Sequence, residues 1–355
     1  MHLPTPPDLA LPAVSTLPDC ADYHLTLAPY LPDLNSLSTT LLSHLTSLDL
    51  PGLRNLYATT NPALSALGFS LALMPVFFVV SEANKNYSQV DRVWSILPTV
   101  YHAHYAVWAH LNHLPTQRMN TLLAFSFLWS ARLTFNYWRK GGYEVGSEDY
   151  RWNIIKDKIG TVGLVVLNIL FISSVQSILL WAITTPAYLL LLTARHDPTT
   201  ENLSDILAPF VLLTLLALET LADNQMSSYQ AAKRNYQRTA KPTASPYTRA
   251  QLDRGFCTTG LWRYSRHPNF ACEQAIWLTI YAWGCLATGT WWNWTGVGAL
   301  GYLGVFAGST PLTEWVSGGK YPEYRVYQRR VGRFVPKLFG KGWDEAEMEK
   351  MGKKK

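Results

Sequence analysis

The sequence predicts an all-α, polytopic membrane protein, and three observations support this fold class. Only 15% of the 355 residues are charged, whereas 48% are hydrophobic and 13% aromatic. Ordinary soluble proteins contain about 25% charged residues. Apolar windows that could cross a bilayer core of about 30 Å recur along the chain. Lys and Arg gather between alternate windows, as the positive-inside rule expects.

The apolar windows predict about seven transmembrane helices. The fourth window would span about 50 Å as one helix at about 1.5 Å per residue, so we expect Pro186 to end or kink it. The windows are residues 63–81, 93–112, 119–136, 161–193, 205–222, 273–290 and 292–311.

The placement of basic residues predicts the orientation of these helices. Of the 30 Lys and Arg residues, 26 lie in four segments: 82–92, 137–160, 223–272 and the chain from 312 onward. This pattern places the N-terminus in the lumen and the C-terminus in the cytosol. We attribute the net charge of +6 to this topology and expect no nucleic-acid partner.

No metal site is expected. The four cysteines lack CxxC spacing, which argues against a zinc site or a disulfide framework. Four histidines fall in or just after the second window, but a membrane di-iron site needs more of them around one metal. We interpret these four as interfacial or hydrogen-bonded helix residues: His102, His104, His110 and His113.

The chain divides into three expected regions. Residues 1–60 are polar and Pro-rich, and we interpret them as a poorly ordered or surface-lying extension with one weak amphipathic helix over 35–50. Residues 61–337 form a single transmembrane helical domain. Residues 338–355 form a basic cytosolic tail in contact with membrane lipids.

Ionisable residues inside or beside the windows are candidate functional groups, because charge is costly in a membrane. Asp91 precedes the second window and Arg132 lies in the third. A buried ion pair between them would explain both equally well. Glu219 and Asp223 are four residues apart and share one helical face. Two such carboxylates repel each other unless a cation or a hydroxyl-rich ligand separates them.

The segment GLWRYSRHPNFACEQAIW, residues 260–277, has the features of an anion site. Pro268 is favoured in the first turn of a helix, so free backbone N–H groups would lie at the cytosolic surface and attract anions. Three basic residues precede this start and suit a phosphate: Arg263, Arg266 and His267. Asn269 and Glu273 follow one turn apart and suit ribose hydroxyls or a carboxamide.

A second basic and aromatic segment follows the last window, at residues 311–336. Its rings and guanidinium groups can stack on a base and bind phosphate, and its candidates are Glu314, Tyr321 and Arg325. Taken alone, the segment fits a basic tail on lipid headgroups equally well. Paired with the Arg-His-Pro segment, it predicts the second wall of a cytosolic cofactor cleft.

Five motifs, taken in order, resemble the steroid 5α-reductase superfamily, especially an uncharacterised membrane branch with a reductase-like C-terminal domain. They are DRVWSILP (91–98), LWSARLTFNYWRK with SEDYRW (128–152), ETLADNQ (219–225), GLWRYSRHPNFACE (260–273) and TEWVSGGKYPEYRVYQRRVGRFVP (313–336). The resemblance implies an all-helical membrane fold in the endoplasmic reticulum, with the cofactor half at about 205–337.

The resemblance also implies hydride transfer from NADPH to a carbon–carbon double bond of a lipid such as a sterol, steroid or polyprenol. Asp223, Asn269 and Glu273 occupy positions that bind NADPH in such reductases. A tyrosine that contacts the steroid ketone is replaced here by Trp129, which departs from 3-oxo-steroid specificity. The candidates for the acid that assists hydride arrival are Asp91, Tyr101 and Arg132.

Two alternatives stay open. Isoprenylcysteine carboxyl methyltransferases, which use S-adenosylmethionine, also have an Arg-His-Pro segment before a span and a Glu, Tyr-x-x-Tyr tail. The additional arginines and the DRVWS and SEDYRW elements favour the reductase, because adenosylmethionine has no pyrophosphate. The other alternative is a non-catalytic sterol-binding membrane protein on a reductase fold, since fold and function are separable.

Overall fold

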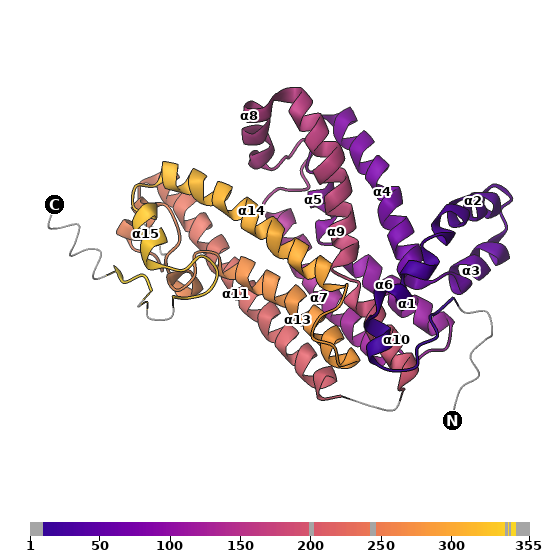
Figure 1. Cartoon of the computed structure of the whole chain (residues 1–355). Coiled ribbons are helices and arrows are strands. Elements are labelled where there is room, and N and C mark those ends of the chain that lie inside the picture. The colour runs from indigo at the N-terminus through magenta and orange to yellow at the C-terminus, as the bar shows by residue number, and fades with distance from the viewer. Residues whose placement is uncertain (1–9, 199–201, 242–245, 338–339, 341, 346–355) are drawn as a thin grey trace. The chain divides into compact units, whose positions relative to one another are not determined.

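The computed structural model describes residues 10–198, 202–241, 246–337, 340 and 342–345, and this part of the chain is built of helices with no β-strand (Figure 1). The all-α prediction is therefore confirmed. The chain divides into two compact units. Unit 1 comprises Met1–Leu212 with Trp277–Tyr302, and unit 2 comprises Leu213–Ile276 with Leu303–Lys355.

Three helical segments of the described chain are long and apolar enough to cross a membrane, not the seven we expected. They are α4 (Pro62–Asn84), the continuous stretch Tyr150–His196 and α11 (Leu203–Thr239). The other windows fail for physical reasons. Helix α6 (Leu97–Leu111) has 15 residues, about 22 Å, and α7 (Gln117–Arg139) contains several polar and basic residues. Glycine and hydroxyl residues dilute the apolar character of α14 (Gly296–Lys320).

The long stretch Tyr150–His196 is divided as its proline predicts. It contains α8 (Tyr150–Leu167), the π-helix Asn168–Val175, α9 (Gln176–Ala182) and α10 (Pro186–His196). Pro186 stands at the start of α10, where it needs no N–H donor. Most of α10 is fully buried within unit 1.

Unit 1 is assembled around α4, α6, α7, α9 and α10. Helix α4 packs against α9 and the π-helix, α6 packs against α7, and α10 packs against both α6 and α7. Arg118 of α7 forms a two-bond ion pair with Asp205, at 2.9 and 2.8 Å, and Trp283 donates to the same carboxylate at 2.8 Å. This buried polar cluster fixes the ends of three helices.

The N-terminal segment is more ordered than we expected. It contains α1 (Tyr23–Thr26), α2 (Asp33–Thr46) and α3 (Leu50–Thr59), with short 3₁₀ helices at Pro18–Ala21 and Ala28–Tyr30. The expected amphipathic helix corresponds to α2, which packs against α3 (Figure 1). Cys20 and Leu27 are buried, so part of this segment contributes to the core.

Unit 2 places the C-terminal motifs together. Besides its parts of α11, α13 (Pro268–Thr288) and α14, it contains α12 (Arg249–Arg254), the 3₁₀ helix Gly260–Arg263 and α15 (Tyr324–Arg330). One aromatic core consists of Phe256, Tyr324, Tyr327, Val331 and Trp343. A second consists of Tyr229, Leu252, Cys257 and Trp262.

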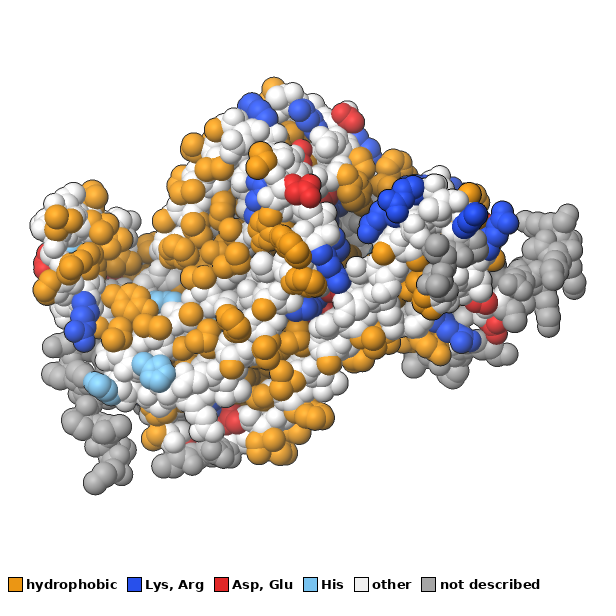
Figure 2. Space-filling view, turned by 180° about the vertical axis from the view of Figure 1, so that it is seen from behind, with side chains coloured by type: hydrophobic (Ala, Val, Ile, Leu, Met, Phe, Trp, Pro, Cys, Tyr) orange, Lys and Arg blue, Asp and Glu red, His pale blue; other side chains and the backbone are white. Residues whose placement is uncertain are grey.

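Hydrophobic side chains are spread over the face of the molecule in Figure 2. On α4 the exposed ones include Phe69, Val76 and Val79, and on α7 they include Phe127 and Trp138. Water does not favour so many exposed apolar side chains. With the three long apolar helices, this surface is consistent with a membrane protein.

Candidate functional site

The candidate cofactor site is built around the start of α13 in unit 2. The preceding 3₁₀ helix is tied to α11, because the Leu261 N–H donates to the Gln225 side chain at 2.9 Å and the Trp262 indole donates to the Ala222 carbonyl at 3.0 Å. Gly260 has φ +61°, and a Cβ there would lie 2.5 Å from the Gln225 side chain. Glycine is therefore required for this close approach.

Arg266 and His267, expected beside a phosphate, are directed to Glu314 of α14. The Arg266 guanidinium donates to both carboxylate oxygens at 2.7 and 3.1 Å, and His267 Nε2 lies 3.0 Å from the first oxygen. The guanidinium also donates to the carbonyls of Gln328 and Val331. The structure thus gives these residues an internal role, and their contact with a cofactor phosphate stays a prediction.

The environment of Glu314 stabilises its ionised form. Burial alone would raise the pKa of this carboxyl, which is 4% exposed. The hydrogen bonds from His267 and Arg266, the guanidinium charge and a bond from Gln328 at 3.1 Å outweigh that effect and lower the pKa to about 2. The cluster of Arg266, His267 and Glu314 therefore joins α13, α14 and the segment after α15 as a buried ionic junction.

Asn269 and Asp223, two of the residues expected at the cofactor, lie in contact with each other. The Asn269 Nδ2 donates to Asp223 Oδ1 at 3.1 Å, which links the first turn of α13 to α11. The Asn269 carbonyl oxygen is buried and accepts no hydrogen bond within the described part of the chain. Glu219 lies one turn before Asp223 in α11, Glu273 lies one turn after Asn269 in α13, and both glutamates are buried. This arrangement offers a ligand an amide acceptor beside several carboxylates.

The segment expected to form the second wall of the cleft buries side chains that we expected to face a cofactor. The rings of residues 311–336 were expected to stack on a base, but two of them, Tyr324 and Tyr327, are buried in the aromatic core, where the Tyr327 hydroxyl donates to the Trp262 carbonyl. Tyr321 is half-buried and lies beside Lys233, while Arg325 is exposed. Arg263 is exposed as well, so two of the predicted cofactor cations face outward within unit 2.

Two buried cations of unit 2, Lys233 and Arg254, were not predicted from the sequence. Lys233 donates to the Gly255 carbonyl at 2.6 Å and to the Tyr321 hydroxyl at 2.7 Å. Arg254 donates twice to Glu345, at 2.8 and 2.7 Å, and covers the ring of Trp343. Both residues lie in segments read as cytosolic and basic, and nothing local distinguishes them from surface charges.

The candidate proton donors lie in unit 1. Asp91, in α5 (Gln89–Trp94), accepts a hydrogen bond from the Trp152 indole at 3.3 Å, which joins the DRVWS and SEDYRW motifs. Burial raises the pKa of Asp91, so this carboxyl is better suited to hold a proton than an exposed one. Tyr101 is fully buried in α6, and Arg132 is part-buried in α7.

The histidines of the second window have several surroundings. His104 contacts the Tyr57 hydroxyl at 2.8 Å and the Pro62 carbonyl at 2.9 Å, and His110 contacts Asn120 at 2.9 Å. These two are hydrogen-bonded helix residues, as we expected. His102 is buried and stacks on Trp277.

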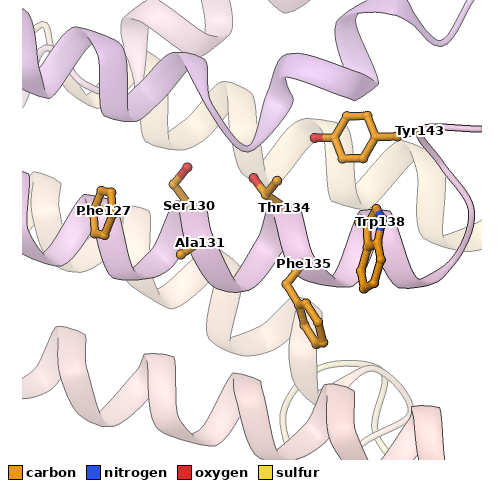
Figure 3. A pocket seen from close by; sticks show the side chains of 7 residues that line it. All are labelled: Phe127, Ser130, Ala131, Thr134, Phe135, Trp138 and Tyr143. Atoms are coloured by element: carbon orange, nitrogen blue, oxygen red, sulfur yellow. The ribbon is translucent and has the colours of Figure 1, made fainter.

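An open hollow of about 540 Å³ lies along α7 in unit 1 (Figure 3). Its few polar groups are partly engaged, since Thr134 bonds Ser95 at 2.7 Å and the Tyr143 hydroxyl donates to the Arg92 carbonyl at 2.9 Å. None of the predicted site residues lines it. The lining residues are Phe127, Ser130, Ala131, Thr134, Phe135, Trp138 and Tyr143.

Comparisons with known proteins cover most of the chain. Residues 77–331 match the family described as "Protein of unknown function (DUF1295)". A protein of Schizosaccharomyces pombe described as uncharacterised is 38% identical over 336 residues, which cover 94% of this chain and 95% of the relative. No solved structure matches the chain significantly. The chain therefore belongs to the DUF1295 family, a steroid 5α-reductase-like family.

Proposed function

We propose that this protein is an NADPH-dependent membrane reductase that reduces a carbon–carbon double bond of a lipid of the sterol, steroid or polyprenol class. The observation that carries the proposal is the Asn269–Asp223 pair at the start of α13. The resemblance to steroid 5α-reductases supports it, and a lipid substrate suits the apolar surface. The endoplasmic reticulum is the membrane we expect.

The buried side-chain oxygen of Asn269 lacks a hydrogen-bond donor among the described residues, and a bound dinucleotide could supply one. A buried acceptor without a hydrogen bond costs about 1–3 kcal/mol, and none of the described residues donates to this oxygen. A carboxamide N–H or a ribose hydroxyl would supply the missing donor. Asp223 would hold the amide in place through the 3.1 Å bond. The residues present therefore fit the polar parts of NADPH.

The remaining residues have separate roles in this proposal. NADPH supplies a hydride when it is bound. Arg263 and Arg325, which are exposed in unit 2, would attract its phosphates, whereas Arg266 would keep the start of α13 in position through Glu314. Asp91 is the first candidate for the acid that gives a proton to the substrate, because its pKa is raised. Tyr101 and Arg132 are the other candidates.

A methyltransferase is the second candidate, and one observation favours it. Arg266 and His267 are bonded to Glu314, so fewer cations are available for a pyrophosphate than the sequence suggested. S-adenosylmethionine carries no phosphate and would not need them. Methyl transfer therefore has to be tested beside hydride transfer.

A thermal-shift titration of the detergent-purified chain separates these candidates. NADPH, NADH and adenosylmethionine are added in turn to the natural protein, to Asn269→Leu and to Gln274→Leu. The control Gln274 lies on the same helix and donates to the Phe270 carbonyl of that helix. The reductase proposal requires stabilisation by NADPH that Asn269→Leu loses and Gln274→Leu retains. Selective stabilisation by adenosylmethionine would favour the methyltransferase, and no response to any of the three would favour a non-catalytic lipid-binding protein.

A further inference from the structure

Three hydrogen-bonding groups are buried without partners where α4, α6 and α9 pack together in unit 1 (Figure 1). They are the hydroxyls of Tyr101 and Tyr105 and the indole N–H of Trp181. Within the described residues none of the three makes a hydrogen bond. Tyr101 is 1% exposed, Tyr105 0% and Trp181 8%. We name Tyr101, Tyr105 and Trp181 the α6–α9 donor cluster.

The members of the donor cluster are neighbours. Tyr101 and Tyr105 are four residues apart and share one face of α6. The Tyr105 hydroxyl lies beside the Trp181 indole, and the Tyr101 hydroxyl lies beside Ser70 of α4. The Ser70 hydroxyl donates its proton to the Ser177 carbonyl at 2.9 Å, so toward Tyr101 it can only accept. The nearest acceptors in the chain are thus the oxygens of Ser70 and Tyr105, but within the described residues neither forms a hydrogen bond of normal geometry with the cluster.

A hydroxyl group from outside the chain would suit this arrangement. An indole N–H can only donate, whereas each phenol can donate or accept. A hydroxyl oxygen accepts from the indole and one phenol while its own proton goes to the other phenol. Buried polar groups in native proteins are almost always satisfied in some such way.

The apolar surface lies close to the cluster. The ring of Phe69 packs edge-to-face on Tyr101 at 6.0 Å between centroids, and Phe69 is 44% exposed on α4. One side chain thus separates the buried phenol from the outer face of a helix long and apolar enough to cross a membrane. An apolar molecule in the bilayer could reach the donors if the Phe69 ring moved aside.

We propose that the α6–α9 donor cluster binds the hydroxyl oxygen of an apolar lipid alcohol that enters from the bilayer past Phe69. The inference deepens the proposed function and rests on it in taking that lipid as the substrate. It adds Tyr105 and Trp181 as specificity-determining residues and gives Tyr101 a binding role.

Binding of matched probes to the detergent-purified full chain, without NADPH, tests this site. The probes are tritiated cholesterol and 5-cholestene, and tritiated farnesol and farnesene, which differ within each pair by the hydroxyl. For at least one pair the natural protein should bind the alcohol roughly five- to tenfold more tightly, the value of one or two buried hydrogen bonds. In the double variant Tyr101→Phe, Tyr105→Phe the ratio should fall to about one. Tyr150→Phe, at an exposed position of α8, should retain it.

A thermal melt of the same variants without probe excludes a merely structural role. Because the two phenols form no hydrogen bond of normal geometry with the described residues, the double variant should melt at the same temperature as the natural protein or higher. A lower melting temperature, an unchanged binding ratio, or no binding of either pair would overturn the site, and the last result would assign the donors to trapped water. If the natural protein binds no NADPH but still prefers the alcohol of a probe pair, only the reductase proposal is refuted.

Discussion

Replacing Glu314 by glutamine should destabilise unit 2 strongly, because the carboxylate is the shared partner of Arg266 and His267. Glu314 is 4% exposed. Arg266 donates two of its hydrogen bonds, at 2.7 and 3.1 Å. Glutamine keeps the size but leaves the Arg266 charge buried without compensation. Breaking a buried pair in this way costs about 3–5 kcal/mol.

The pKa of Glu314 gives a second measure of the same interaction. Its ordinary value is 4.5 and the folded value is about 2, a difference that corresponds to about 3 kcal/mol. Because the folded pKa is depressed, this stability is fully present above about pH 4.5 and is lost as the pH falls toward about 2. The magnitude therefore agrees with that expected for breaking the pair.

Denaturant titrations of the detergent-purified protein at several pH values measure both effects. At pH 7 the free energy of unfolding of Glu314→Gln should be lower by about 3 kcal/mol, and the difference from the natural protein should shrink below pH 4.5. Glu323→Gln is the matched control, since Glu323 pairs with Arg254 but its side chain is 53% exposed, and it should change stability by less than about 1 kcal/mol. A change below about 1 kcal/mol for Glu314→Gln at pH 7 would refute the reasoning.

Three further predictions concern other positions. Gly260→Ala should lower the melting temperature and the stability of unit 2 by about 1–3 kcal/mol, because φ is +61° and the new Cβ would meet Gln225; an unchanged melt would contradict it. Arg118→Ala should cost about 3–5 kcal/mol in a denaturant titration by leaving Asp205 without its buried cation, and a loss under about 1 kcal/mol would argue against this pair. Asp91→Asn should spare NADPH binding, measured by calorimetry, and lower lipid turnover at least tenfold; a variant that binds NADPH more weakly but reduces the lipid as fast as the natural protein once NADPH is bound would contradict the assignment.

Local signals in the sequence located the helix starts well. Pro268 opens α13 and Pro186 opens α10, because proline has a fixed φ and no N–H to satisfy. The resemblance assigned Asn269 and Asp223 to one cofactor site, and the structure brings these two side chains into contact across 46 residues of sequence. The two helix starts depend only on the proline and on residues within one turn of it.

Features that depend on distant partners could not be predicted. Glu314 lies 48 residues from Arg266, and no periodicity in either segment shows that the two meet. Tyr324 and Tyr327 have the composition of a base-stacking surface, yet packing on Phe256 and Trp343 buries them. The number of long apolar helices was overestimated because each apolar window was read without the polar residues and breaks that shorten its helix.

The central claim is that the start of α13 holds NADPH through Asn269. The most direct measurement is calorimetric titration of NADPH into the purified natural protein and into Asn269→Leu. The account predicts saturable binding to the natural protein and at least a tenfold loss in affinity for the variant. Equal binding to both proteins, or binding of adenosylmethionine in place of NADPH, would contradict it.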